Sequence, residues 1–119
     1  MKKSFAFFLL IISLFFVCGC TQFDVEDFSY VEDYNYYKDA PGLKQSNFVN
    51  TERTEVQDAN QAVELAKKEC TVPYDSIAVA FDAGQKIYRI NFYKKDWLGG
   101  DQSVYINHEG LTQLILYGE

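Results

Sequence analysis

The sequence is poor in the residues from which catalytic and metal sites are built, since it holds one histidine and three cysteines. A nucleophilic triad requires a histidine beside a nucleophile and an orienting acid, yet His108 stands in a predicted turn and no G-x-S-x-G motif occurs. The nearest set of metal-ligand types is divided between two loops: Asp96, Asp101, His108 and Glu109. Gly99-Gly100 leads into a predicted strand, whereas a phosphate-binding loop opens a helix. We therefore expect neither enzymatic activity nor a bound metal or cofactor.

A hydrophobic run long enough to cross a bilayer is also missing. The apolar run Phe5–Val17 has 13 residues and one interruption, Ser13, against the roughly 18–20 residues of a transmembrane helix. With Lys2 and Lys3 before it, this run is typical of a signal peptide. The A-x-A-like cleavage site of an ordinary secretory signal is absent, and the run ends instead in Val17-Cys18-Gly19-Cys20.

These four residues resemble the lipobox of bacterial lipoproteins, in which an aliphatic residue, a small residue and Gly or Ala precede an invariant cysteine. The resemblance implies that residues 1–19 are a lipoprotein signal peptide and that Cys20, as the mature N-terminus, carries a diacylglyceryl group on its thiol. Two acyl chains hold a protein stably on a membrane, whereas one chain does so only marginally. We therefore expect a lipid-anchored protein that faces outside the cytoplasm, at the cell surface or in the periplasm. The alternative is an uncleaved membrane anchor or a plain secretory signal.

The mature chain expected from this cleavage is strongly acidic. Loss of Lys2 and Lys3 leaves 9 of the 11 basic residues against 17 acidic ones, a net charge of −8 over 100 residues. Such a charge argues against nucleic acid as a partner and against attraction to anionic lipid.

Cys70 is then the one remaining thiol of the expected mature chain, so an internal disulfide is excluded. We expect it to pack as a small apolar group on a helix, the alternative being a reactive thiol or one that pairs between molecules.

Residues 20–55 show no sustained helix or strand period, and we expect them to form an extended tether. Six acids and one base, Lys38, are interleaved with six aromatic residues between positions 23 and 39, and the turn-forming Ala40-Pro41-Gly42 follows. Repulsion among the acids favours an extended segment. Three roles stay open: a solvated spacer, a short motif whose aromatics dock on a partner, or a segment whose tyrosines fold back over the sheet of the globular domain.

The periodic part of the chain begins near Val56 and predicts a small α+β domain over residues 56–119. Asp58 and Gln61 form a capping-box-like helix start. A single apolar stripe of a helix follows, made of Ala59, Ala62, Val63, Ala66 and Cys70. Four strand-like runs come next, separated by Asp82-Ala83-Gly84, by the loop from Lys94 to Asp101, and by the hairpin turn Asn107-His108-Glu109-Gly110. We expect one helix packed on a four-stranded antiparallel sheet.

The segments DANQAVELAKKE, FDAG, WLGGDQSVYI and NHEGLTQLILYGE resemble, in their order and turns, small bacterial domains of the PepSY-like type and a group of NTF2-fold immunity proteins. The likeness covers about residues 56–119. The chain departs from the immunity group in having Tyr88 where that group has Trp, and in being short for a complete NTF2 cone. The resemblance therefore favours a PepSY-like or cystatin-like unit of a helix on a sheet. It implies binding, inhibition or neutralisation of another protein, without enzymatic activity.

Two functions remain open at this point. The first is a non-catalytic binding module for a protein or cell-wall ligand, with a surface immunity protein against a toxin as a special case. Its candidate binding residues are Trp97 in the Gly-Gly loop and, on the sheet face away from the helix, Arg89 and Tyr105, with Asn91 and Asn107 beside them. The expected core on the other face is Ile77, Val79, Phe81, Tyr88, Ile90, Phe92, Val104 and Ile106. The second is an envelope spacer in which the tether is the working part; a tether folded onto the outer face would favour it, and exposed binding residues would favour the first.

Overall fold

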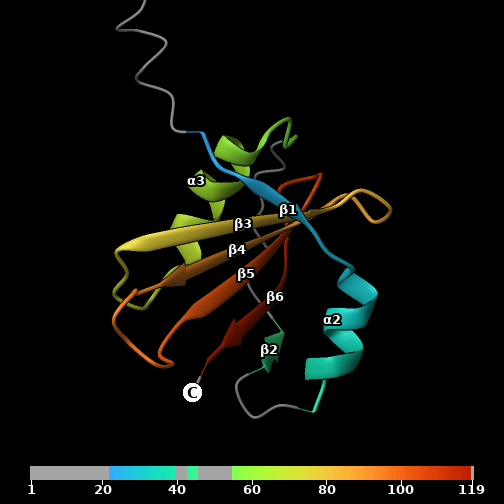
Figure 1. The fold of residues 1–119 in the computed structure, drawn as a ribbon. Coiled ribbons are helices and arrows are strands. Elements are labelled where there is room, and N and C mark those ends of the chain that lie inside the picture. The colour runs from blue at the N-terminus through green and yellow to red at the C-terminus, as the bar shows by residue number, and fades with distance from the viewer. Residues whose placement is uncertain (1–21, 40–42, 46–54, 119) are drawn as a thin grey trace, which may run out of the picture.

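The computed structural model describes residues 22–39, 43–45 and 55–118, which form an α+β fold (Figure 1). Within these residues there are two helices, α2 (Tyr30–Tyr37) and α3 (Ala59–Glu69), and one six-stranded sheet. The strands are β1 (Val25–Asp27), β2 (Leu43–Gln45), β3 (Ser76–Asp82), β4 (Ile87–Tyr93), β5 (Gln102–Asn107) and β6 (Thr112–Tyr117). The expected signal peptide and Cys20 lie outside the described residues. In the described part of the chain, no helix has the length and apolar character that a membrane crossing needs.

The strand order β1-β3-β4-β5-β6-β2 contains the predicted four-stranded antiparallel meander, β3 to β6, at its centre. The register places the expected core residues side by side, because Val79 pairs with Ile90 and Ile90 pairs with Val104. The short strands β1 and β2 extend the two edges, β1 parallel to β3 and β2 antiparallel to β6.

Helix α3 begins and packs as its sequence predicts. The Asp58 side chain accepts a hydrogen bond from the Gln61 amide at 2.9 Å, and the Gln61 side chain accepts one from the Gln57 amide at 2.6 Å. The first bond satisfies an amide that a helix start otherwise leaves free, and the second fixes the residue before the N-cap. Figure 1 shows α3 behind the sheet, where it contacts β4 and β5, and its stripe residues Ala62, Val63 and Ala66 are buried.

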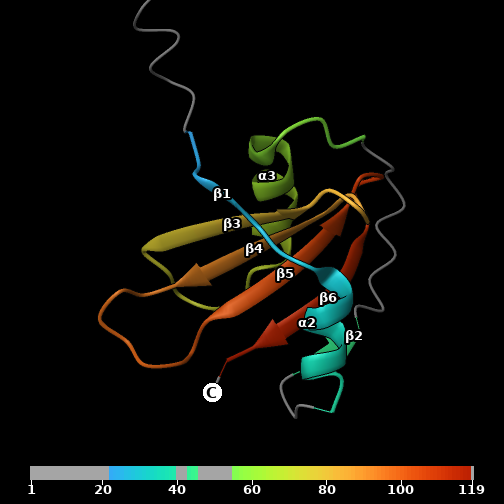
Figure 2. The same cartoon turned by 45° about the vertical axis from the view of Figure 1, so that its right-hand side comes forward.

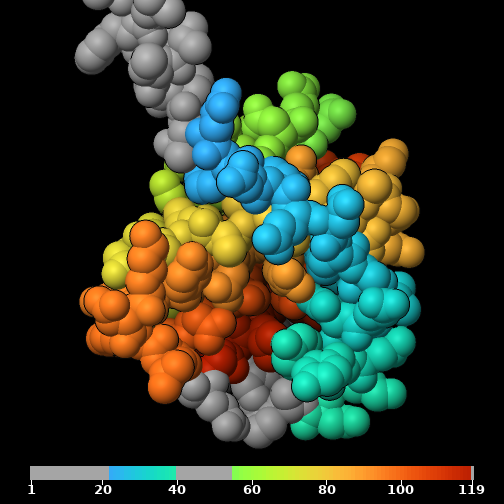
Figure 3. Space-filling view, viewed as in Figure 1, coloured from blue at the N-terminus to red at the C-terminus, as the bar shows by residue number. Residues whose placement is uncertain are grey.

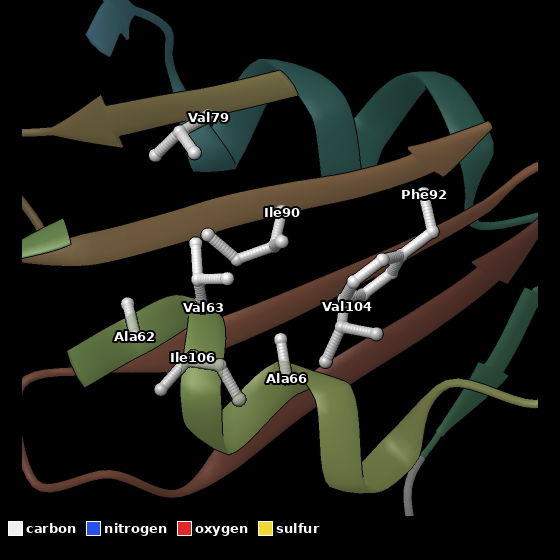
Figure 4. Close-up of a cluster of buried hydrophobic side chains, with 8 residues drawn as sticks. All are labelled: Ala62, Val63, Ala66, Val79, Ile90, Phe92, Val104 and Ile106. Atoms are coloured by element: carbon white, nitrogen blue, oxygen red, sulfur yellow. The ribbon is translucent and has the colours of Figure 1, made fainter. Parts of the chain in front are cut away.

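The main core lies between α3 and the sheet and consists of Ala62, Val63, Ala66, Val79, Ile90, Phe92, Val104 and Ile106 (Figure 4). The small side chains of α3 let the helix backbone approach the strands, so that Val63 reaches Ile90 and Ile106 across the layer. Ile77, Tyr88 and Cys70 are partly buried at the margin of this cluster. Phe81 is half-buried and contacts Tyr88, with ring centroids 4.5 Å apart. Seven of the eight predicted core residues therefore lie in or against this cluster, whereas Phe81 lies outside it.

One polar side chain, Gln102, is fully buried at the edge of this core. Its Nε2 donates to the carbonyl of Glu69 at 3.0 Å, and its Oε1 accepts from the Thr71 amide at 2.8 Å. Gln102 thereby satisfies a free carbonyl at the end of α3 and joins the chain that follows the helix to β5.

The expectation of an extended tether over residues 20–55 is wrong for three stretches, because β1, α2 and β2 all fall within it. The expectation of one helix and four strands is corrected accordingly. These elements escaped prediction because β1 and β2 have three residues each, too few for an alternating pattern. Helix α2 has eight residues and buries none of them, so it lacks an apolar stripe. Figures 1 and 2 show that α2 lies on the sheet face opposite α3, whereas β1 continues the sheet as the edge strand beside β3.

Candidate functional site

The outer face of the sheet is formed by the side chains that alternate with those of the main core. It carries Ala78 and Ala80 from β3, Arg89 and Asn91 from β4, and Ser103 and Tyr105 from β5. At one end of this face a second cluster of buried residues, Ile87, Tyr105 and Leu114, is packed against the partly buried Phe28 and Tyr30. The aromatic N-terminal segment therefore folds back over part of the sheet, one of the three roles its sequence left open.

The start of helix α2 is held on the sheet by Asp82, at the end of β3. The Asp82 carboxylate accepts a hydrogen bond from the Tyr30 amide at 2.8 Å and others from the amides of Gly84 and Gln85 at 2.9 and 3.0 Å. A negative charge is favourable at a helix N-terminus, where backbone amides point outward. The bond from Tyr30, followed by those from Gln85 and Gly84, lowers the pKa of Asp82 in spite of its burial.

The side chain that attaches α2 to the outer face is Asp33. Its Oδ2 accepts a hydrogen bond from Arg89 Nη1 at 2.7 Å and another from the Tyr105 hydroxyl at 2.9 Å. The Arg89 guanidinium also lies 4.8 Å from the centre of the Phe28 ring, a cation–π distance. Burial, and then the charge and hydrogen bond of Asp33, raise the pKa of Tyr105 far above its ordinary value. The hydroxyl therefore stays protonated and serves as a donor to Asp33.

Between α2 and the opposite side of the sheet the outer face is hollowed into an open cleft of about 520 Å³. Ala78, Ala80 and Ser103 line its floor, and their small side chains leave the hollow visible in Figure 3. Glu26 of β1 and Tyr37 of α2 line one side. In Figure 3 the cyan surface of α2 borders the hollow.

The other side of the cleft is built around Asp101, just before β5, with Tyr117 and Gly118 at the end of β6. Asn91 Nδ2 donates to Asp101 Oδ2 at 2.8 Å and to Ser103 Oγ at 2.9 Å, which fixes all three side chains. The Gly118 amide donates to the Asp101 carbonyl at 2.9 Å, and the Asp101 carboxylate leaves no room for a Cβ at Gly118. This side is therefore a rigid arrangement of polar groups.

The four residues predicted to share the outer face have different surroundings in the structure; they are Arg89, Asn91, Tyr105 and Asn107. Arg89 and Asn91 line the cleft and are half-buried. Tyr105 also lines it, but only 1% of its surface is exposed, so its expected role as an exposed contact is wrong. The reason is that α2, Phe28 and Tyr30 cover it. The Asn107 side chain accepts from the amides of Glu109 and Leu111 and so belongs to the β5–β6 turn.

Trp97 lies in the β4–β5 loop, apart from the cleft. It is 52% exposed, and Lys94 Nζ lies 4.6 Å from the centre of its ring. The sequence left open whether Trp97 is an exposed contact or a lid on the core, and its exposure favours the contact. Trp97 and the pair Arg89–Tyr105 therefore belong to two separate surfaces.

The remaining chemically notable residues lie apart from one another. The Cys70 thiol donates to the Val72 carbonyl at 3.4 Å and is half-buried at the end of α3. His108 lies exposed in the β5–β6 turn, at the opposite end of β5 from Asp101. Over the residues that the structure describes, no three His, Cys, Asp or Glu side chains gather as metal ligands would.

Sequence reasoning missed Glu26, Asp33 and Tyr37 as site residues, because it placed all three in an extended tether. The sequence held one signal for them, the composition of residues 23–39. Acids alternate there with aromatic residues, and a predicted strand of the sheet carries Arg89, with which an acid can pair. Comparison with family models, with curated proteins and with solved structures finds no match for this chain.

Proposed function

We propose that this protein is a lipid-anchored extracytoplasmic lipoprotein whose domain binds a protein or cell-wall ligand in the outer-face cleft, without catalysis. The observation that carries the binding role is the cleft itself, a hollow of about 520 Å³ whose polar side chains are held in place before any ligand arrives. Such prior order reduces the entropy that binding would otherwise cost. The lipid anchor is supported by Val17-Cys18-Gly19-Cys20 after the apolar run of the sequence.

The cleft suits a ligand that donates hydrogen bonds. Glu26 and Asp101 bring two carboxylates to its sides, and Arg89, the one cation among the described residues that line it, is paired with Asp33. The uncompensated charge of the cleft is therefore negative, like that of the whole chain. Amines, basic side chains and the hydroxyl groups of a saccharide fit this chemistry, and the small floor residues leave room for an extended segment.

A tether folded onto the outer face was expected to favour the envelope spacer, but the way in which this segment folds supports a binding module instead. A spacer would work through its extended length, yet β1 and α2 are attached to the sheet by strand pairing and by Asp33 and Asp82. This segment also supplies Glu26 and Tyr37 to the cleft. We further propose that the central four strands and α3 form a unit of the PepSY-like or cystatin-like kind.

Filling the cleft tests the binding role. Ala78 lies exposed on the floor, so Ala78→Tyr should occupy the hollow without disturbing the strand ladder. Lys68→Tyr adds the same side chain to an exposed position of α3 and is the matched control. Purified cell-wall sacculi and detergent-solubilised envelope proteins are each offered to immobilised protein. The proposal requires that Ala78→Tyr loses a binding activity that wild type and Lys68→Tyr retain; equal binding by all three would exclude the cleft.

Replacing Cys20 tests the lipid anchor. Cys20→Ser lacks the thiol that forms the thioether, so metabolic labelling with palmitate should disappear and the precursor should stay unprocessed. Cys70→Ser, which leaves Cys20 in place, should label like the wild type. Persistent labelling of the Cys20→Ser protein would contradict the lipoprotein assignment.

A further inference from the structure

The β4–β5 loop presents an apolar tip of two adjacent residues. Leu98 is completely exposed and Trp97 is 52% exposed. The tip has a defined shape, since the Trp97 amide donates to the Lys94 carbonyl at 3.1 Å and the Lys95 amide donates to Asp75 Oδ1 at 3.2 Å. Gly99 and Gly100, both at positive φ, then return the chain to β5. An ordered loop that exposes its two largest apolar side chains fits a surface that covers them.

This tip lies at the same end of the sheet as the start of β1. Strand β1 is parallel to β3 and β3 is antiparallel to β4, so the beginning of β1 and the end of β4 point to the same end. In Figures 1 and 2 the orange β4–β5 loop lies at the left-hand end of the strands, below β4, and the blue β1 enters at the upper left, above β3. One strand, β3, separates β1 from β4, so the two strands lie about 10 Å apart where β1 is paired, beside Val79–Phe81.

The covalent chain limits how far a lipid on Cys20 can be from the domain. Phe23 is partly buried against the main core, which ties the chain to the domain three residues after Cys20. Three residues span at most about 10 Å. A lipid on Cys20 would therefore hold this end of the sheet at the bilayer surface, and the domain would not be lifted away on a long spacer.

We propose that Trp97 and Leu98 insert into the interfacial region of the bilayer that holds Cys20, as a second, non-covalent membrane contact. Trp favours this region, with its ring among lipid headgroups. Because Lys94 and Lys95 balance Asp96 and Asp101, the loop has no net charge, and apolar burial drives the insertion. A weak affinity suffices, since the lipid on Cys20 gives the loop a high effective concentration at the surface. The lipid on Cys20 and the inserted loop tip together orient the strands along the membrane normal, so that the cleft opens parallel to the membrane surface. This inference rests on the lipid anchor of the proposed function and is independent of the cleft.

Trp97 is the one tryptophan of the chain, so its fluorescence reports on the loop alone. The mature lipidated protein is reconstituted into phosphatidylcholine vesicles with brominated acyl chains, which quench a fluorophore only when it enters the bilayer. We expect a blue shift and a loss of emission relative to unbrominated vesicles. Both effects should persist at high salt and should not require anionic lipid, because the loop is neutral.

Two variants locate the effect on the tip. Leu98→Ser should lose most of the quenching, whereas Val31→Ser, which changes an exposed apolar residue of α2, should keep it. In the double variant Trp97→Phe with Gln85→Trp, the tryptophan moves to the β3–β4 hairpin at the opposite end of the sheet and should not be quenched. If palmitate labelling succeeds and Trp97 emission is the same in both kinds of vesicle, the insertion is refuted while the lipoprotein assignment stands. Equal quenching at positions 97 and 85 would also overturn it.

Discussion

Removing the Asp33 carboxylate tests how α2 is held on the sheet. Asp33→Ala removes the acceptor of the Tyr105 hydroxyl, and Tyr105 is only 1% exposed. An unsatisfied buried hydroxyl costs about 1–3 kcal/mol. The lost ion pair with Arg89 adds little, because that side chain is 30% exposed and solvent screens it, so about 0–1 kcal/mol applies. We expect a loss of about 2 kcal/mol in the free energy of unfolding.

The assay is a double-mutant cycle with Tyr105→Phe. The free energy of unfolding of each variant is measured by urea denaturation, with Trp97 fluorescence as the signal. Tyr105→Phe removes the hydroxyl that Asp33 satisfies, so the double variant should be less destabilised than the sum of the singles, with a coupling of about 1–2 kcal/mol. Glu32→Ala removes a neighbouring exposed acid of α2 and should change stability by only about 0.5 kcal/mol. Additive effects of Asp33→Ala and Tyr105→Phe would refute the contact, and with it the docking of α2.

Two further predictions concern polar groups elsewhere. The pKa of Asp82 is lowered in the folded protein, so its contribution to stability is present above the unfolded pKa of about 4 and is lost as the pH falls through the folded value. The difference in melting temperature between wild type and Asp82→Ala should therefore be large at neutral pH and shrink in acid, and a constant difference would contradict it. Gln102→Ala should lower the free energy of unfolding by about 2–3 kcal/mol, because it opens a cavity and frees the Glu69 carbonyl and the Thr71 amide. Gln85→Ala, at an exposed position, is the control and should have little effect.

The parts of the fold that could be predicted are those whose stability follows from local sequence. Asp58 and Gln61 mark the start of α3, and alternation from Ile77 to Ile106 distinguishes the core face from the outer face. The turn before β6 was also predicted, and Gly110 has the positive φ it requires, with its amide bonded to the Asn107 carbonyl. In each case the signal lies within one element and its neighbours in the chain.

The candidate site could not be predicted because its contacts join residues that are far apart in sequence. Asp33 is 56 residues from Arg89 and 72 from Tyr105, and Tyr30 is 52 from Asp82. Helix α2 buries no residue of its own, so its stability depends on these contacts rather than on an apolar stripe. Repulsion among the acids of this segment was taken to keep it extended, but two contacts outweigh it: the pairing of Asp33 with Arg89, and the hydrogen bond from the Tyr30 amide to Asp82 of β3.

A last prediction concerns how much of the molecule folds without this segment. A truncated protein that begins at Asn50 keeps every fully buried residue of the main core, from Ala62 to Ile106. It loses Phe23, Phe28, Tyr30 and the Asp33 contacts, although water then satisfies the Tyr105 hydroxyl. Partial burial of three aromatic rings is worth about 1–2 kcal/mol each, so we expect a loss of about 3–6 kcal/mol. Since small domains have about 5–15 kcal/mol in total, the truncated protein should still unfold cooperatively in urea, at a lower midpoint than the protein that begins at Thr21. If it shows no cooperative transition, then β1 and α2 are part of the folding unit, and the domain begins near Gln22 rather than Val56.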